Sequence, residues 1–461
     1  MRKQLSENEV GLILKTLQRL YRRNASVAMY KLVYKTHPAD MAWVYRHLNS
    51  IERKDIFQFI ERMEGLGDFL NELDDAIIIE LFGSLSPNHI AEVLGNIDAD
   101  DIVGILDVLP NETSTEIREL LNLEERKEVE ELLQYDDESA GRIMSTHFVA
   151  FQEILTVQEA IVKFQELKNK DTDAPFYIYV INEKNQMAGV LSLRQLLLNK
   201  PKTALKDIID DDFIAVSPDT DQEEVAKLVS QYNYLALPVV EKNNELVGVI
   251  TVDDVIDILR EEATEDILKM AGAGQDREIL LKSTFDNAKT RFPWLMASWI
   301  GGVIALMIIG AFETLLEKTV ALVAFIPVII GMGGNVGTQT STIIVRGIAT
   351  GRVNVNEVYK IIFKEIRVGM LLGIIYGAFL GVLAYFRFVD FTSPVELGFI
   401  VGISIFFAMT IACTIGSLFP IVLDKLNFDP AISTGPFVTT AIDIVGVLIY
   451  FYIATFFLGF K

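Results

Sequence analysis

Cysteine is almost absent from this 461-residue sequence. The one cysteine, Cys413, lies inside an apolar run, which excludes disulfide bonds and cysteine-based metal sites. Any metal bound by this chain must therefore be held by oxygen ligands. Carboxylates are plentiful, because 63 Asp and Glu stand against 41 Lys and Arg.

Long apolar runs are missing from the first 281 residues, and basic residues are under-represented there. That stretch has 29 Lys and Arg against 53 Asp and Glu, a net charge of −24. Such a charge repels nucleic acid and anionic lipid and favours cations or basic partners, so nucleic-acid binding is excluded. Residues 1–30 have no apolar core segment. We therefore expect no signal or transit peptide, and a cytoplasmic soluble half.

A phosphate-binding loop is also missing. Gly272-Ala273-Gly274 is not followed by the Lys-Ser/Thr pair that such a loop requires, and nothing resembles an aspartyl-phosphate motif. We expect no enzymatic activity.

The last 180 residues contain five apolar stretches long enough to cross a bilayer, which takes about 20 residues. They are 292–316, 319–345, 366–386, 397–423 and 434–459. Basic residues gather before the first stretch and between the second and third: Lys282, Lys289, Arg291, Arg346, Arg352, Lys360, Lys364 and Arg367. The other connections are balanced in charge and hold Glu317, Lys318, Arg387, Asp390 and Glu396. The positive-inside rule then predicts a cytoplasmic N-terminus and an outside C-terminus.

Two spans contain polar groups at membrane depth. Residues 331–342 (GMGGNVGTQTST) place glycines and side-chain oxygens inside the second span, and Asp443 lies about ten residues into the fifth. Polar or irregular backbone survives at this depth where it is buried in protein or lines a water-filled path. We interpret residues 331–342 as pore lining, with helix packing as the alternative. Asp443 is interpreted as a cation site, because an ionisable group there usually faces a pathway or a partner and no deep Lys, Arg or His pairs with it.

Oxygen ligands suit hard divalent cations, and Mg²⁺ in particular is held by one or two carboxylates. One Asp443 per chain predicts a symmetric homodimer in which two copies face one hydrated ion. Mn²⁺, Co²⁺ and Ca²⁺ stay open as alternatives. In the third span Gly369, Gly373, Gly377 and Gly381 recur every four residues, which predicts a face for close helix packing.

The soluble half contains two duplications. Residues 48–57 align with 94–103 at a shift of 46, which predicts a small helical superhelix over 1–135. Phe148-Val149-Ala150 then aligns with Phe213-Ile214-Ala215 at a shift of 65, and Gly189-Val190-Leu191 aligns with Gly248-Val249-Ile250 at a shift of 59. This strand, turn, strand and helix order resembles a tandem pair of CBS domains.

Acidic residues cluster at two helical positions of the soluble half. Asp98, Asp100 and Asp101 begin a helix, where they either cap it or contact a cation. Asp254, Asp257, Glu261 and Glu265 share one face of a helix that follows the second CBS copy, opposite Val252, Val255, Ile256 and Leu259. Either this stripe is solvated or it senses cations, because like charges at this spacing destabilise a helix.

The order of helical repeat, CBS pair, acidic helix and five spans resembles the MgtE family of magnesium channels along essentially the whole chain. The motifs that carry the resemblance are Glu262-Ala263-Thr264-Glu265-Asp266, then Gly333-Gly334-Asn335 with Thr338-Gln339, and Gly435-Pro436-Phe437-Val438-Thr439-Thr440 before Asp443. The implied fold class is a multidomain membrane protein with an all-α superhelical N-terminal domain, an α+β tandem CBS pair and a five-helix α transmembrane domain. The implied domains are 1–135, CBS copies at 136–200 and 201–258, a linking plug helix at 259–290 and the membrane domain at 291–461.

The resemblance implies a homodimeric channel for passive Mg²⁺ influx in the cell membrane, with Asp443 in the pore and Asn335 supporting it. Cytoplasmic Mg²⁺ would close it by binding acidic surfaces of the N-terminal domain, CBS pair and linking helix. The sensing candidates are Asp98, Asp100, Asp101, Asp254, Asp257, Glu261, Glu262, Glu265 and Asp429. ATP is left open as a ligand of the CBS pair. The alternatives are a transporter of Mn²⁺ or Co²⁺ and a membrane-anchored CBS regulatory protein.

Overall fold

The computed structural model describes residues 7–167, 177–274, 283–353, 358–389 and 393–459. Lys282 and Asp390, which entered the orientation argument, lie outside these residues. The chain divides into two compact units, Met1–Arg260 and Glu261–Lys461.

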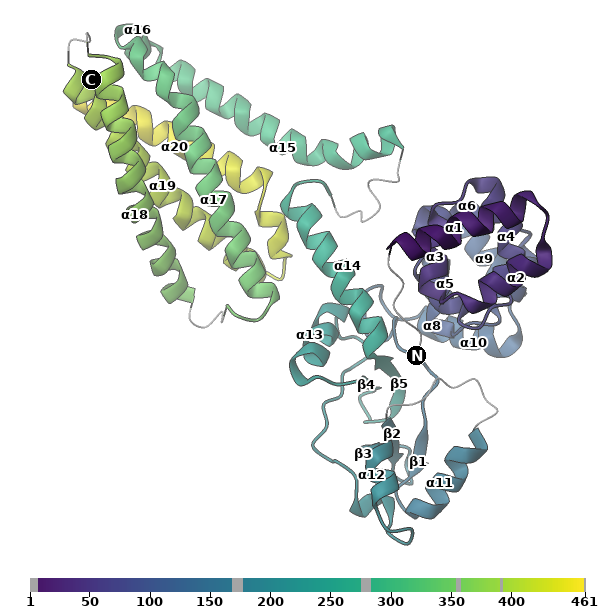
Figure 1. Cartoon of the computed structure of the whole chain (residues 1–461). Helices are drawn as coiled ribbons and strands as arrows, with labels where there is room; N and C mark the ends of the chain where they lie inside the picture. The colour runs from purple at the N-terminus through teal and green to yellow at the C-terminus, as the bar shows by residue number, and fades with distance from the viewer. Residues whose placement is uncertain (1–6, 168–176, 275–282, 354–357, 390–392, 460–461) are drawn as a thin grey trace. The chain divides into compact units, whose positions relative to one another are not determined.

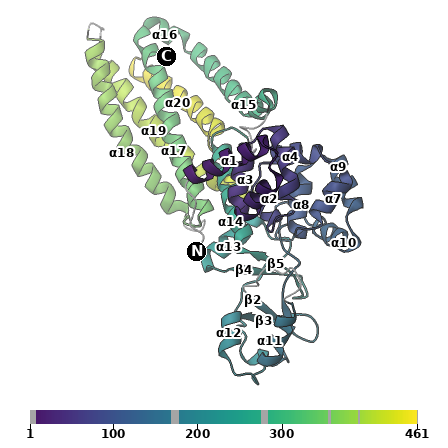
Figure 2. The same ribbon diagram turned by 45° about the vertical axis from the view of Figure 1, so that its right-hand side comes forward.

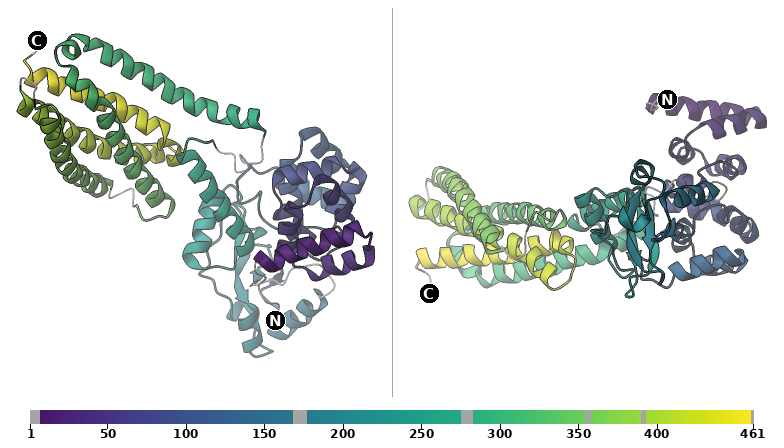
Figure 3. Two further views of the ribbon diagram at one scale, coloured as in Figure 1. Left: turned by 45° about the horizontal axis from the view of Figure 1, so that its top comes forward. Right: turned by 90° about the horizontal axis from the view of Figure 1, so that it is seen from below.

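Short helices make up the first part of the soluble unit and follow one another in a row (Figure 3, right). They are α1 (Glu7–Arg22), α2 (Ser26–Lys35), α3 (Pro38–Arg46), α4 (Ser50–Ile60), α5 (Leu66–Asn71), α6 (Asp75–Gly83), α7 (Pro87–Leu94), α8 (Ala99–Val108), α9 (Asn111–Leu120) and α10 (Leu123–Leu132). The two aligned segments run into α4 and α8, and the equivalent residues Ile56 and Ile102 are both fully buried. The predicted helical repeat is thus confirmed.

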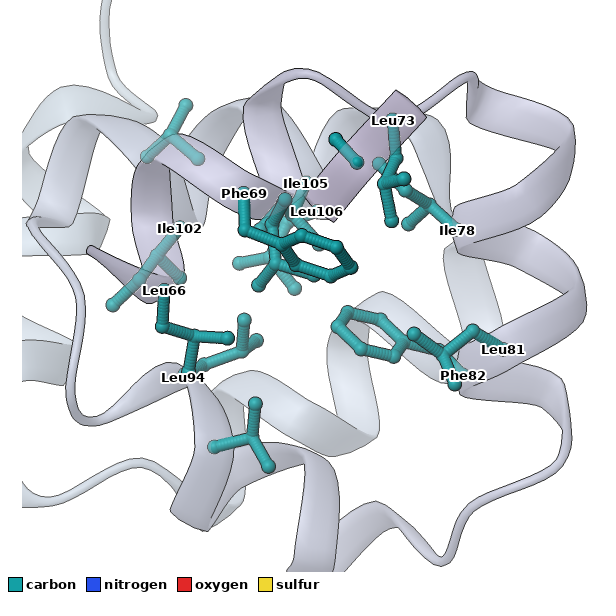
Figure 4. Packing of buried hydrophobic residues seen from close by; sticks show 14 of the residues in the cluster. Leu66, Phe69, Leu73, Ile78, Leu81, Phe82, Leu94, Ile102, Ile105 and Leu106 are labelled. Carbon is teal, nitrogen blue, oxygen red and sulfur yellow. The ribbon is translucent and has the colours of Figure 1, made fainter. Parts of the chain in front are cut away.

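Apolar side chains from successive helices of this domain share one core. In Figure 4, Phe69 of α5, Phe82 of α6 and Leu106 of α8 point toward one another, and all three are at most 2% exposed. Burial of large apolar side chains is the main stabilising term for such short helices, which are marginal by themselves. Local caps add to it. Asn49 and Glu52 form a capping box at the start of α4.

The CBS region contains two similar half-domains (Figure 1). The first holds β1 (Ala150–Gln152), α11 (Val157–Glu166), β2 (Tyr177–Ile181), β3 (Met187–Ser192), α12 (Leu193–Leu198) and the 3-10 turn η2 (Leu205–Asp207). The second holds α13 (Gln222–Tyr232), β4 (Ala236–Val240) and β5 (Leu246–Thr251). Strand β2 pairs parallel with β1 and antiparallel with β3, while β4 and β5 pair antiparallel. Thr156 and Asp221, aligned in the sequence, cap the equivalent helices α11 and α13.

A single helix, α14 (Val252–Met270), contains the acidic stripe as predicted. The apolar side of the helix is only partly buried. Val255 is buried, but Ile256 and Leu259 are 59% and 42% exposed. Of the four apolar residues that lie opposite the acidic stripe, Val255 is therefore packed into the domain core, whereas Ile256 and Leu259 are exposed.

The membrane unit contains α15 (Thr284–Ala311), α16 (Glu313–Lys318), η3 (Val320–Phe325), α17 (Ile326–Ala349), α18 (Val358–Arg387), α19 (Pro394–Lys425), η5 (Pro430–Ser433) and α20 (Pro436–Phe457). Among the described residues five segments are long and apolar enough to span a membrane. Each contains or overlaps one predicted span. Helix α18 is longer than the predicted third span and starts eight residues earlier.

The glycine-rich face of α18 packs against α19 of the same chain, and the two helices lie side by side in Figures 1 and 2. A Cβ atom added at Gly377 would come 2.5 Å from the carbonyl oxygen of Gly402, and one at Gly381 would come 2.7 Å from that of Gly398. No side chain fits at such distances. The predicted packing role is confirmed, and the face is occupied by α19 rather than being available to a second chain.

Candidate cation sites

Asp443 lies on α20 beside a hollow of about 410 Å³ between α15, α17 and α20. The lining residues are Ser298, Gly301, Gly302, Ala305, Leu306, Ile309, Ile330, Thr439, Thr440 and Asp443. A Cβ added at Gly334 of α17 would lie 3.6 Å from Asp443 Oδ1, so the backbone of α17 passes close to the carboxylate. The site thus combines a carboxylate and hydroxyls with enough space for a partly hydrated ion.

The polar segment 331–342 is part of one continuous helix, α17, rather than irregular backbone. Its glycines admit neighbouring helices. A Cβ at Gly337 would collide with Ile442 of α20, and one at Gly416 of α19 would lie 2.5 Å from the Gly337 carbonyl oxygen. Helix packing, the alternative interpretation, therefore explains Gly333 and Gly337, which are buried.

Asn335 is not in the hollow beside Asp443. Asn335 and Gln339 are one helical turn apart on the exposed side of α17, whereas Gly333, Gly334, Val336 and Gly337 are buried. Within one chain Asn335 is therefore exposed and does not line the hollow that Asp443 lines. Two amides on the outside of a spanning helix would face hydrocarbon, which cannot satisfy their hydrogen bonds.

Glu365 is a buried carboxylate of the membrane unit that the sequence reasoning missed. Its side chain belongs to α18 and is 7% exposed. Thr340 Oγ1 of α17 lies 3.4 Å from Glu365 Oε2 and 3.5 Å from Cys413 Sγ of α19. Asp443 is therefore not the only carboxylate within a span. Glu365 was overlooked because the third span was expected to start at residue 366.

Two sensing candidates of the membrane unit, Glu265 and Asp429, are joined by a lysine. The Lys269 ammonium lies 2.5 Å from Glu265 Oε1 and 2.6 Å from Asp429 Oδ2, and Glu265 and Lys269 are both 9% exposed. Burial by itself would lower the pKa of Lys269, but the hydrogen bonds of the two carboxylates outweigh it and raise that pKa. The ammonium thus already supplies the positive charge that these two carboxylates require.

The acidic cluster of the soluble unit lies where α8 and the start of α14 meet. It contains Asp98, Asp100, Asp101 and Asp254, defined here as the aspartate cluster. Asp100 is the most deeply placed, and its Oδ1 is buried without a hydrogen-bond partner among the described residues. Asn71 donates a 2.5 Å hydrogen bond to Asp101, and Thr251 donates one of 2.5 Å to Asp254.

Burial and mutual repulsion raise the pKa values of three of these carboxyls, those of Asp100, Asp101 and Asp254. Burial is the main cause in each case; it raises the pKa of Asp101 to about 7 and that of Asp254 to about 6. The pKa of Asp100 is raised well above its ordinary value by burial and then by Asp101, Asp254 and Asp98. No basic side chain of the described residues offsets the charge of Asp100, Asp101 and Asp254, so a proton or a cation would stabilise these three carboxyls.

Capping does not account for Asp98. It holds the N-cap position of α8, yet its side chain makes no capping hydrogen bond. Its Oδ1 lies 3.4 Å from His147 Nδ1 instead, and the hydrogen bond with Asp98 raises the pKa of His147. The alternative that Asp98 serves only as a helix cap is thus disfavoured.

The remaining sensing candidates are more dispersed. Asp257 and Glu261 are exposed on α14, and Glu262 is half-buried. In the described part of the chain no three His, Cys, Asp or Glu side chains gather closely enough to hold a metal ion directly. The stripe on α14 is therefore not one site: Asp254 joins the aspartate cluster, and Glu265 joins Lys269.

Known proteins resemble the chain in each region described above. Residues 326–453 match the MgtE divalent cation transporter model, residues 36–138 the MgtE intracellular N domain, and residues 140–200 and 205–261 the CBS domain. The chain is 39% identical to the magnesium transporter MgtE of Bacillus subtilis over 324 residues and 36% identical to that of Thermus thermophilus over 323, in both cases 70% of each chain. A crystal structure of the soluble part of a magnesium transporter superposes with a TM-score of 0.51 at 28% identity, covering 55% of this chain and all of that one.

Proposed function

Because this chain belongs to the MgtE family of magnesium transporters, we propose that it acts as a homodimeric channel for passive Mg²⁺ influx. Its five spans make it a multi-pass membrane protein of a transporter family rather than an enzyme family. The observation that carries the proposal is the hollow beside Asp443, which offers carboxylate and hydroxyl oxygens inside a spanning bundle. An ion that sheds part of its water there regains oxygen contacts and a negative charge.

The exposed amides of α17 support a dimer. Asn335 and Gln339 face away from their own chain, and lipid cannot satisfy them. A second copy related by a two-fold axis would cover this face and bring both amide pairs to the axis. Asn335 would then support the pore from the shared surface, while Asp443 supplies charge from its own hollow. The N-terminus would be cytoplasmic and the C-terminus outside.

Cytoplasmic Mg²⁺ would close the channel through the aspartate cluster. Two observations support a cation site in this cluster. The buried Oδ1 of Asp100 has no hydrogen-bond partner among the described residues, and the pKa values of Asp101 and Asp254 are raised. Bound Mg²⁺, which would keep part of its water, would supply positive charge among these carboxylates. Without it the carboxylates repel one another and favour separation of α8 from α14, which would shift the population toward the open channel. Asp257, Glu261 and Glu262 would add weaker cation contacts along α14. We include ATP as a ligand of the CBS pair only because the family resemblance implies it.

Ion flux into proteoliposomes tests the proposal. Purified protein is reconstituted, and influx of Mg²⁺, Mn²⁺, Co²⁺ and Ca²⁺ is measured under a potassium-valinomycin potential with no proton gradient. We expect Mg²⁺ influx that follows the imposed potential and exceeds the flux of the other three ions. If influx requires a proton gradient, the protein is an exchanger and the channel proposal is wrong. If Mn²⁺ or Co²⁺ influx equals or exceeds Mg²⁺ influx, Mg²⁺ is not the preferred substrate.

A further inference from the structure

The first two helices differ in charge from the rest of the soluble unit. Residues 1–35 contain eight Lys and Arg against two Glu, a net charge of +6, whereas residues 36–281 carry −30. The match to the MgtE intracellular N domain begins only at residue 36. We define α1 and α2 as the N-terminal hairpin. The basic residues of the hairpin therefore lie outside the part of the chain that the family model matches.

One side of the hairpin is anchored in the domain core. Leu17 of α1 and Met29 and Val33 of α2 are at most 4% exposed and belong to the main core cluster. The two helices lie next to α3 and α4 in Figure 1. The opposite side is therefore held in a defined orientation on a folded support.

The opposite side combines cations with large apolar side chains. On α1, Leu12, Lys15, Arg19 and Arg22 follow steps of three, four and three, and all are exposed. On α2, the exposed residues are Val27, Tyr30, Lys31, Tyr34 and Lys35, again at helical spacing. Val27 is 73% and Tyr34 56% exposed, and the rings of Tyr30 and Tyr34 stack with centroids 6.1 Å apart. Such a mixture of Lys, Arg, Tyr and aliphatic residues is typical of surfaces that lie in the headgroup region of a bilayer.

The acidic surface of the same unit does not neutralise these cations. Within the described residues no ion pair involves Lys15, Arg19, Arg22, Arg23, Lys31 or Lys35. A purely acidic protein surface would pair with the cations but would leave Val27, Tyr30 and Tyr34 in water. An anionic lipid surface would bind both the cations and the apolar side chains of the hairpin. Headgroup phosphates attract the cations, and the boundary with the acyl chains accepts the apolar side chains.

We infer that the exposed side of the N-terminal hairpin docks onto the anionic lipid surface of the bilayer in which the chain is anchored. The acidic remainder of the soluble unit repels that surface, but at physiological ionic strength charges act over only about 8 Å, so the local charge of the hairpin decides. Tethering by the spans gives the hairpin a high effective concentration at the membrane, and a weak contact is sufficient.

Hydrogen exchange of the full-length protein in lipid nanodiscs tests this inference. Discs of phosphatidylcholine alone are compared with discs that also contain phosphatidylglycerol. We expect several-fold slower exchange over residues 7–35 in the anionic discs only, with the protection lost at high salt. Replacing Arg19, Arg22, Lys31 and Lys35 by Glu should abolish the protection. The matched control replaces four exposed lysines of the CBS region, Lys163, Lys206, Lys227 and Lys242, by Glu and should retain it.

A triple variant, Val27→Ser, Tyr30→Ser and Tyr34→Ser, tests the apolar half and should weaken the protection while its salt dependence persists. Exchange over α3 and α4 reports whether each variant is folded. Equal exchange in neutral and anionic discs overturns the inference. So does protection that is independent of lipid charge but lost in the Glu variant, since this would assign the surface to the acidic face of a second protein copy.

Discussion

At the scale of single residues, removing the charge of Asp443 tests the ion path most directly. Asp443→Asn keeps the side-chain volume, so the bundle should remain folded. Divalent flux should fall on the order of a hundredfold, because a charge at membrane depth is worth about 3 kcal/mol and an amide cannot replace it for a partly dehydrated ion. The measurement is Mg²⁺ uptake by proteoliposomes. Asp424→Asn near the end of α19 is the control and should leave uptake unchanged. Wild-type uptake by the Asp443→Asn protein would remove Asp443 from the path.

Lys269 provides a second residue-scale prediction. In Lys269→Met the Glu265 and Asp429 carboxylates lose the charge between them, and breaking a buried ion pair costs on the order of 3 kcal/mol. The end of α14 should then separate from η5 at low Mg²⁺, and millimolar Mg²⁺ should restore the contact by bridging the two carboxylates. Single-channel recording should show higher opening at low Mg²⁺ and a steeper response to Mg²⁺ than wild type.

The control for this variant is Lys425→Met, because Lys425 is an exposed lysine at the end of α19. Adding Asp429→Asn to Lys269→Met relieves the repulsion and should return opening at low Mg²⁺ toward the wild-type level. An unchanged Mg²⁺ response in the single variant would mean that the Lys269 bridge does not take part in gating.

The charged residues show how far sequence reasoning reaches. Asp443 could be predicted because an isolated carboxylate in an apolar run is visible in one dimension. The Lys269 bridge to Asp429 joins residues 160 positions apart, and only the folded chain shows that α14 and η5 meet. The cap interpretation of Asp98 failed for a similar reason, because His147 competes for the same oxygen from a distant segment.

At the scale of elements, α8 and α14 should respond to pH. Carboxyls whose pKa is raised in the folded state stabilise the packed arrangement at low pH, below their unfolded pKa near 4, and this contribution is lost as pH rises through the folded values of about 6 for Asp254 and 7 for Asp101. As the pH rises, His147 also loses its proton, and with it the positive charge beside Asp98. Without divalent ions, the aspartate cluster should therefore loosen between pH 6 and pH 8.

Mg²⁺ and protons should compete for this cluster. The Mg²⁺ concentration that gives half-maximal protection against limited proteolysis should fall several-fold from pH 6 to pH 8, because fewer protons have to be displaced. Replacing Asp100 and Asp101 by Asn should flatten this dependence, whereas Glu112→Gln on the exposed surface of α9 should not alter it. A midpoint that does not move with pH would contradict a cation site built from these carboxyls.

The α18–α19 pair yields a prediction about packing. In Gly377→Ala the new methyl group would lie 2.5 Å from the Gly402 carbonyl oxygen, so the two helices must separate. We expect a loss of about 1–3 kcal/mol in stability, measured as unfolding of the membrane unit in detergent. Gly310→Ala is the matched control, since nothing lies within 4 Å of its added Cβ. Equal stability of both variants would show that the close approach is not required.

The positions of helices and strands were easier to predict than the contacts that each element makes. The five spans, the helical repeat and the two CBS halves follow from apolar length and from internal repetition, which are properties of contiguous sequence. Which face of a helix is covered depends on its neighbours. For this reason the sequence could not show that Gly334 approaches Asp443, whereas the next residue, Asn335, is exposed and does not line the hollow.

At the scale of the whole molecule, the exposed amides of α17 predict where two chains meet. In a Cys413→Ser background, Asn335→Cys should form a cross-link between two chains in lipid, because in the proposed dimer residue 335 of both copies would lie near the two-fold axis. The control is Phe379→Cys on the lipid-exposed side of α18, where Phe379 is 69% exposed. Dimer bands on a denaturing gel are the measurement. Cross-linking at residue 379 but not at 335 would place the interface on α18 instead.

The contact between α18 and α19 also bears on how the protein is made. A bare glycine face exposes backbone, and lipid tails pack poorly against it until a partner helix arrives. The third span therefore stays incomplete until the fourth leaves the ribosome, and the two should settle in the membrane as one hairpin. A chain that stops after Arg387 would expose this glycine face to lipid permanently, and we expect the cell to degrade such a chain faster than one that continues through α19.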